Sequence, residues 1–129
     1  MASGFLLDTN ALLRLHIEPR KFGRQTLSLL DSGRAVYYST ISMFEIAIKS
    51  ERGGPNPDSI AIANLSAGLS ELAFNARHAA AAREQRSLKG ADPFDSMLLG
   101  QAAAEGLVLV TSDRELLDTK SNFVIDSAL

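Results

Sequence analysis

Several acidic residues of this chain stand where a strand-like run ends or a helix-like segment begins. Asp8 directly follows Phe5-Leu6-Leu7, and Asp113 follows Leu107-Val108-Leu109-Val110 with two residues between. Glu45 lies about one turn into the helix expected after the second strand-like run. In an open parallel sheet, ligands bind outside the carboxyl ends of the strands. We therefore expect these three carboxylates to converge at one edge of a sheet.

Two further acids, Asp92 and Asp95, lie in the first turn of a helix that is expected to begin at Pro93. They join the other three only if the amino end of that helix points toward the same crevice. Their position therefore depends on how the helix packs, which the sequence pattern does not determine.

Helix capping is the competing explanation for each acid taken singly. Asp8 fits an N-cap, and Asp92-Pro93 fits a capped start with proline in the first position. Ser42-x-x-Glu45 and Ser112-x-x-Glu115 fit the capping box. However, carboxylates that converge on one crevice repel each other and raise each other's pKa unless a cation neutralises them. The combination therefore favours a cation site over capping alone.

The side chains available to such a site are oxygen donors. The chain has no cysteine, and its two histidines, His16 and His78, fall on separate expected helices, where both are expected to be surface or boundary residues. Carboxylates select hard cations such as Mg²⁺ or Mn²⁺, which also bind phosphate oxygens. This predicts phosphodiester hydrolysis, in which a metal-activated water attacks in line and leaves 5′-phosphate and 3′-hydroxyl ends. Without a histidine pair, attack by an internal 2′-hydroxyl has no acid and base to assist it.

Along the chain, segments with the hydrophobic periodicity of a strand alternate with segments that have the periodicity of a helix, and these elements must position the acids. Five runs are expected to be strands, namely 5–7, 35–38, 71–74, 107–110 and 123–125. The expected helices are 10–16, one from Pro19 to Gly33, 42–51, one capped by Asp58, 75–86 capped by Asn75, one from Asp92 and Pro93 to Gly106, and a short one from about Asp113. Strands interleaved with helices predict an α/β fold whose parallel sheet is covered on both faces. The length of 129 residues predicts a single domain over residues 1–129.

Composition narrows the classes of protein further. The chain is 46% hydrophobic and has no run of about 18 apolar residues, so no membrane span is expected. Met1-Ala2-Ser3-Gly4 has no basic leader region, which favours a cytoplasmic location. The formal charge of −2 argues against binding nucleic acid by bulk charge. Lys49 and Arg114 are the best candidates for local contacts to it, although Lys49 also has the i,i+4 spacing for an ion pair with Glu45.

The same residues carry a resemblance to a known family. The matching segments are Phe5-Leu6-Leu7-Asp8-Thr9-Asn10, Ser42-Met43-Phe44-Glu45-Ile46-Ala47-Ile48-Lys49, Ala91-Asp92-Pro93-Phe94-Asp95 continuing to Gln101-Ala102, and Leu109-Val110-Thr111-Ser112-Asp113. In order and spacing they resemble PIN-domain nucleases, specifically the VapC type of bacterial toxin.

The resemblance implies a three-layer α/β/α sandwich with a five-stranded parallel sheet, and a Mg²⁺- or Mn²⁺-dependent endoribonuclease. It implies partners as well: an RNA substrate, a cognate antitoxin that neutralises the toxin, and a second copy in a homodimer. The implied metal ligands are Asp8, Glu45, Asp95 and Asp113, which would also be the catalytic set. Asp92 matches a further acidic position that binds metal directly or through water, and Asn10 and Thr111 match supporting polar positions.

This sequence departs from the subgroup at three places. Lys89-Gly90-Ala91 stands where a His often precedes Asp-Pro, Ser96 replaces a frequent Arg, and Phe44 replaces a frequent Trp. The missing Arg removes a cation that could touch substrate or pair with an acid.

Three other functions compete with the nuclease. A phosphatase with Asp8 as nucleophile would want an acid two residues on, where Asn10 stands. A receiver-like module that binds Mg²⁺ would need adjacent acids after the first strand, and only Asp8 is there. A degenerate nuclease that acts by binding only is disfavoured by the intact acids.

Overall fold

The computed structural model describes residues 4–85, 92–119 and 121–129. Five strands form one sheet in the order β3-β2-β1-β4-β5, and every neighbouring pair is parallel. The strands are β1 (Gly4–Leu7), β2 (Ala35–Ser39), β3 (Ser70–Leu72), β4 (Val108–Thr111) and β5 (Val124–Asp126). The predicted five-stranded parallel sheet is therefore confirmed.

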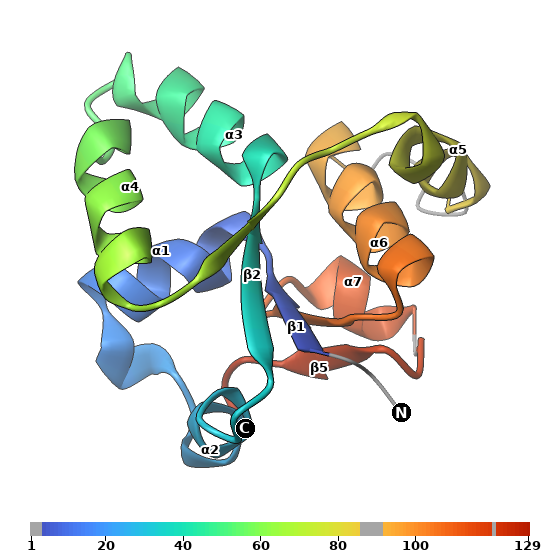
Figure 1. Ribbon diagram of the computed structural model, residues 1–129, viewed down its shortest axis with the longest axis horizontal. Helices are drawn as coiled ribbons and strands as arrows, with labels where there is room; N and C mark the ends of the chain where they lie inside the picture. The colour runs from blue at the N-terminus through green and yellow to red at the C-terminus, as the bar shows by residue number, and fades with distance from the viewer. Residues whose placement is uncertain (1–3, 86–91, 120) are drawn as a thin grey trace.

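Helices cover both faces of the sheet, as Figure 1 shows. On one side lie α1 (Thr9–Ile17), α3 (Thr40–Ser50) and α4 (Pro57–Ser66). On the other side lie α5 (Ala76–Glu84), α6 (Pro93–Glu105) and α7 (Arg114–Asp118). The remaining two elements, the 3₁₀ turn η1 (Pro19–Lys21) and α2 (Arg24–Leu30), follow α1. The layers are those of the predicted α/β/α sandwich.

The alternation of side chains along β1 produces two hydrophobic cores. Successive residues of a strand point to opposite faces. Phe5 and Leu7 pack with Leu12 and Ile46 on the α1 and α3 side, whereas Leu6 packs with residues of α6 and α7. Both faces of the central strand are thus buried, which explains why Phe5, Leu6 and Leu7 are all hydrophobic.

The helix predicted from Pro19 to Gly33 is wrong as a single element, because it breaks into η1 and α2. Phe22 between them has extended backbone and is buried in the core. Gly23 then passes so close to Leu129 that a Cβ atom would lie 2.0 Å from its carbonyl carbon. The break lets Phe22 enter the core and the last residues pack beside α2.

Two helices begin earlier than their expected caps. α3 begins at Thr40 after Ser39, whose hydroxyl accepts a hydrogen bond from the Ile41 amide, and α4 is capped by Asn56 instead of Asp58. β3 ends at Leu72 because the Phe74 amide donates to the Thr40 hydroxyl instead of continuing the ladder. The Asn75 cap of α5 is confirmed, and the expected end of that helix at residue 86 lies outside the described residues.

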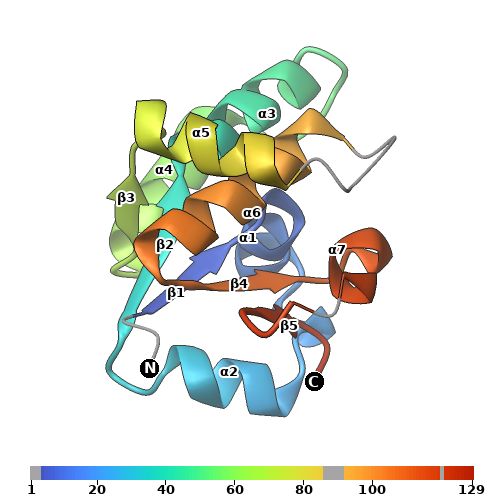
Figure 2. The same ribbon diagram turned by 90° about the vertical axis from the view of Figure 1, so that its right-hand side faces the viewer.

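The packing of α6 against α5 is close. A Cβ atom at Gly100 would lie 2.3 Å from the Ala82 amide nitrogen, so only glycine fits there. Figure 2 shows α5 lying over α6, with the sheet on the other side of α6. In the part of the chain that the structure describes, no helix is long and apolar enough to cross a membrane.

Candidate functional site

Asp8 is fixed at the carboxyl end of β1 by backbone and side-chain hydrogen bonds. Its amide donates to the Val110 carbonyl at 3.0 Å, which continues the β1–β4 ladder by one residue. One carboxylate oxygen accepts from the Ala11 amide at 2.7 Å, and the other accepts from the Thr111 hydroxyl. The side chain is only 3% exposed. Burial raises its pKa to about 6; the hydrogen bonds oppose this, while the charges of Asp113 and Glu45 add to it.

Thr111 links Asp8 to Asp113. Its buried hydroxyl donates to Asp8 and accepts a hydrogen bond from the Asp113 amide at 2.9 Å. Asp113 then caps α7, accepting from the Glu115 and Leu116 amides. The loop after β4 therefore holds Asp113 in place beside Asp8.

Glu45 reaches the same region from α3. The Thr9 hydroxyl donates to the Ser42 hydroxyl at 2.9 Å, and both residues are buried. Because Thr9 follows Asp8 and Ser42 lies one turn before Glu45, this bond ties the two elements that carry these acids. The Glu45 carboxylate is mostly buried and forms an ion pair with Lys49 at 3.2 Å.

The amino end of α6 points toward these acids. Asp95 lies in the first turn of α6 and is half-buried. Burial and, after it, the negative charges of Asp113, Asp8, Asp92 and Glu45 together raise its pKa to about 7. All five acids therefore share one region, and the question that the sequence left open about α6 is answered.

Capping and clustering are not alternatives here. Asp8, Asp92 and Asp113 each cap a helix, so three of the five acids perform the role that local pattern also favoured. The two proposed capping boxes are wrong, because Ser39 caps α3 and Asp113 itself caps α7.

The donor set suits a hard divalent cation. Among the described residues, no three Asp, Glu or His side chains are spaced closely enough to enclose a metal ion directly. The carboxylates nevertheless raise the pKa of Asp95 together, and a cation between them would relieve that repulsion. Mg²⁺ keeps several of its waters and binds few carboxylates, so this open arrangement fits it.

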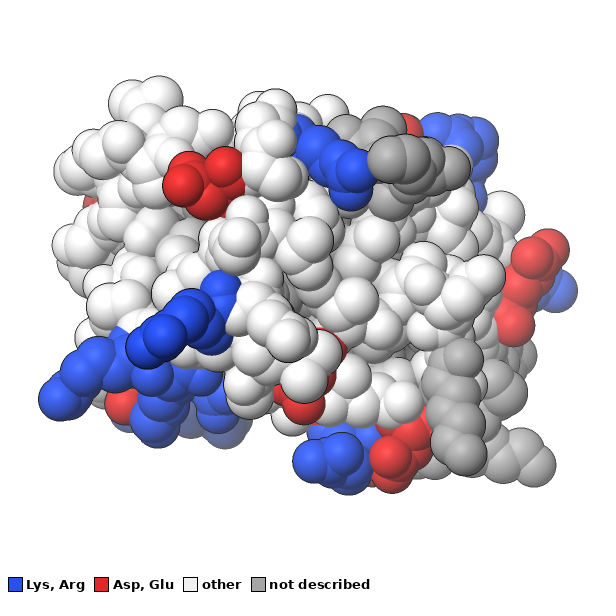
Figure 3. All heavy atoms as spheres, turned by 90° about the horizontal axis from the view of Figure 1, so that it is seen from below, with Lys and Arg blue, Asp and Glu red and all other residues white. Residues whose placement is uncertain are grey.

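The residues expected to contact RNA or to support the site, Lys49, Arg114 and Asn10, differ in exposure and in partners. Lys49 takes part in the ion pair with Glu45, which is the structural role that its spacing also predicted. Arg114 and Asn10 are exposed. Figure 3 shows the largest group of Lys and Arg side chains at the lower left of the face seen from below, with smaller basic and acidic groups elsewhere around its edge.

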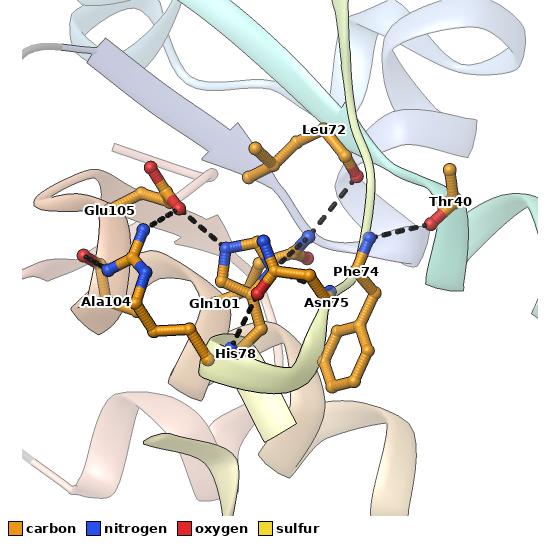
Figure 4. Close-up of polar contacts among 9 residues, drawn as sticks. Thr40, Leu72, Phe74, Asn75, His78, Gln101, Ala104 and Glu105 are labelled. Atoms are coloured by element: carbon orange, nitrogen blue, oxygen red, sulfur yellow. Dashed lines mark hydrogen bonds and ion pairs between the residues drawn. The ribbon is translucent and has the colours of Figure 1, made fainter. Parts of the chain in front are cut away.

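The expectation that both histidines are surface or boundary residues is wrong for His78. It is fully buried between α5 and α6, where its Nδ1 accepts from the Asn75 amide and its Nε2 lies 2.6 Å from the Glu105 carboxylate. Beside it, the Gln101 amide donates to the Leu72 carbonyl (Figure 4). This cluster ties the loop after β3 to α6. The sequence signal for it was the Asn75 cap, three residues before His78.

Compared with models of known protein families, residues 5–122 of the chain match the PIN domain model. The chain belongs to the PIN domain family. The matched residues include every acid of the cluster, so the family inferred from the four motifs is confirmed. No curated protein matches this PIN domain in sequence.

Solved structures share the fold over nearly the full length. VapBC-1 from nontypeable Haemophilus influenzae superimposes with a TM-score of 0.72 at 20% identity, covering 98% of this chain and 99% of that chain. The DNA-bound VapBC of Salmonella typhimurium gives 0.68 at 24% identity, covering 95% and 97%. VapBC2 from Rickettsia felis, bound to a promoter DNA fragment, gives 0.71 at 18% identity, covering 95% and 98%.

Proposed function

We propose that this PIN domain is a divalent-metal-dependent endoribonuclease that hydrolyses RNA phosphodiester bonds. The observation that carries the proposal is the placement of five carboxylates in one region, where helix caps and the hydrogen bonds of Thr111 and Thr9 hold the segments that carry them. Burial and the charges of the other four acids raise the pKa of Asp95 there. A fold that gathers five carboxylates at the carboxyl edge of its sheet stores repulsion that a bound cation relieves. Membership of the PIN domain family supports the same conclusion.

In this proposal Asp8, Glu45, Asp95 and Asp113 hold the Mg²⁺ or Mn²⁺ ion, and Asp92 assists directly or through water. When bound, such an ion makes water easier to deprotonate and stabilises charge on phosphate oxygens. Thr111 orients Asp8 and Asp113 through the two hydrogen bonds described above. Helix caps hold Asp8, Asp92 and Asp113, so each carboxylate keeps its direction while the substrate binds.

We assign contacts to the RNA backbone to two cationic side chains beside the acids, Arg114 and Lys49. Arg114 is exposed and directly follows Asp113, so it is placed to meet a phosphate beside the acids. Lys49, which pairs with Glu45 at 3.2 Å, would be the second side chain to contact a phosphate, from one turn further along α3. Asn10 would support the substrate or the metal from the first turn of α1.

The biological role that we infer is that of a cytoplasmic toxin, held inactive by a cognate antitoxin and assembled as a homodimer. The support is the fold shared with chains of VapBC complexes from three bacteria. Co-expression with the product of an adjacent reading frame, followed by size-exclusion chromatography with light scattering, tests both partners.

The enzymatic proposal is tested by incubating the purified protein with a fluorescently labelled RNA, with Mn²⁺ and with chelator. We expect cleavage only with the metal, and its loss in Asp95→Asn. Asp58→Asn is the matched control, because Asp58 also follows a proline in the first turn of a helix but lies outside the acid cluster. Equal cleavage by the Asp95 variant and wild type would refute the proposal.

A further inference from the structure

Phe44 differs from the other aromatic residues of the chain. The described residues include all six Phe and both Tyr, and only Phe44 is exposed, with 59% of its surface accessible. The other rings are buried or half-buried. The one ring offered to solvent lies on α3, directly before Glu45.

A second ring fixes the position of Phe44. Phe94 lies on α6, directly before Asp95, and its ring centroid is 6.2 Å from that of Phe44 with the planes 72° apart. Edge-to-face contact is a favoured geometry for two aromatic rings. The pair therefore bridges α3 and α6 beside two of the clustered acids, and holds Phe44 in one orientation while most of its surface stays open.

The negative charge of the site favours a contact to RNA that does not depend on charge. The protein carries a formal charge of −2, the site itself is acidic, and nearby Lys49 is paired with Glu45. Phosphate contacts supply a large share of the affinity of ordinary nucleic-acid binding, and beside the acids they are assigned to only two side chains, Arg114 and Lys49. Stacking of a base on an aromatic face needs no opposite charge and tolerates any base, because every base has a π-face.

We propose that Phe44 is a stacking platform for an unpaired nucleobase of the RNA, next to the phosphate that is cleaved. This inference rests on the proposed nuclease function and deepens it. Phe94 acts as the support that holds the platform, and the base lies on the open side of Phe44. Such a platform selects single-stranded RNA, since neighbouring base pairs cover both faces of a base inside a duplex.

The chain's lack of tryptophan makes a direct test possible. Phe44→Trp, in an Asp95→Asn background that keeps the RNA intact, places a single fluorophore at the platform. Leu65→Trp in the same background is the control, because Leu65 is 81% exposed but lies near the end of α4 that leads toward the start of β3. Each protein is titrated with an unstructured oligoribonucleotide and with an abasic oligomer of the same length and charge.

We expect the base-containing RNA to quench Phe44→Trp, while the abasic oligomer does not, and Leu65→Trp to respond to neither. Equal quenching by both oligomers would mean backbone contact alone and would overturn the inference. So would a tryptophan signal that ignores RNA but shifts with protein concentration, because Phe44 would then belong to a contact between proteins.

A kinetic test separates this inference from the proposed function. In metal-supported cleavage, Phe44→Ala should raise KM on the order of tenfold, with a smaller change in kcat, as expected for loss of one stacked base. Phe44→Tyr should restore KM, whereas Phe44→Leu should not, and Leu65→Ala should leave both constants unchanged. Wild-type protein that does not cleave RNA refutes the nuclease proposal. The fluorescence titration of Phe44→Trp then still tests whether a base stacks at position 44. Cleavage by the wild type with an unchanged KM in Phe44→Ala refutes the stacking alone.

Discussion

The buried carboxylate of Asp8 should make the metal-free protein less stable as the pH rises. Its pKa is raised from 3.8 to about 6 in the folded state, chiefly by burial. A group whose pKa is raised by folding binds its proton more tightly in the folded protein, so its contribution to stability is complete below pH 3.8 and is lost as the pH passes 6. At about 1.4 kcal/mol per pH unit, the free energy of unfolding falls by about 3 kcal/mol on this account.

Urea unfolding of the wild type and Asp8→Asn, both in chelator, measures this effect between pH 4 and pH 8. Asparagine retains an oxygen to accept from the Ala11 amide but does not titrate. The unfolding free energy of the wild type relative to the variant should therefore fall by about 2.5 kcal/mol over this range, because the carboxyl of the unfolded chain is already partly ionised at pH 4. Groups that Asp8 does not influence titrate alike in both proteins and cancel in the comparison. Asp95, whose pKa the charge of Asp8 raises, adds to the fall in the same direction.

Adding Mg²⁺ or Mn²⁺ at pH 8 should then recover the stability of the wild type and do little for Asp8→Asn, because the cation replaces the lost proton as the neutralising charge. A difference between the two proteins that stays constant from pH 4 to pH 8 would refute the reasoning, since the carboxylate would then titrate alike in the folded and unfolded chain.

Three further predictions concern the same site. Millimolar Mg²⁺ or Mn²⁺ should raise the melting temperature of the wild type and of Asp58→Asn, with a smaller or no rise in Asp95→Asn. At a metal concentration of a hundred times Kd, the added free energy of unfolding is about 3 kcal/mol. An unchanged melting temperature, in a protein first shown to be metal-free, would contradict a formed site. Asp95→Asn should lose nearly all RNA cleavage while its circular dichroism stays native, whereas Asp92→Asn should retain measurable cleavage, and the opposite ranking would contradict the assigned roles. Ser42→Ala should cost about 1 kcal/mol in urea unfolding and lower kcat, because it removes the buried hydrogen bond to Thr9, whereas Thr9→Ser keeps that bond and should stay close to wild type in kcat.

The central sheet could be predicted because its signal is local. Runs of apolar residues such as Phe5-Leu6-Leu7 are short, fully hydrophobic and followed by a helix-like segment, as expected for a parallel strand buried on both faces. The carboxyl ends of β1 and β4 then fixed the expected positions of Asp8 and Asp113. Both side chains lie where the end of each strand predicted.

Features that depend on distant parts of the chain could not be predicted. The break before α2 exists because Phe22 enters the core and Gly23 meets Leu129, more than a hundred residues away. His78 is buried because α5 packs closely on α6, which places Glu105 beside its ring. Short patterns around single residues carry no information about such contacts.

The start of α3 shows the limit of motif reading. Ser42-x-x-Glu45 has the letters of a capping box, but β2 pairs with β3 only as far as Ser39, so the helix begins there. Glu45 is left free to pair with Lys49 and to join the acid cluster. The contact between Phe44 and Phe94 likewise needs α3 and α6 together, although each ring directly precedes an acid in the sequence.

The chemistry of the RNA ends tests the central proposal most directly. A water molecule that attacks in line expels the 3′ oxygen, whereas attack by the RNA's own 2′-hydroxyl leaves a cyclic phosphate. Fragments made by the wild type with Mn²⁺, analysed by end-labelling and mass spectrometry beside an Asp8→Asn control, should carry 5′-phosphate and 3′-hydroxyl ends. Cyclic 2′,3′-phosphate ends that the wild type produces and the control does not would contradict the account.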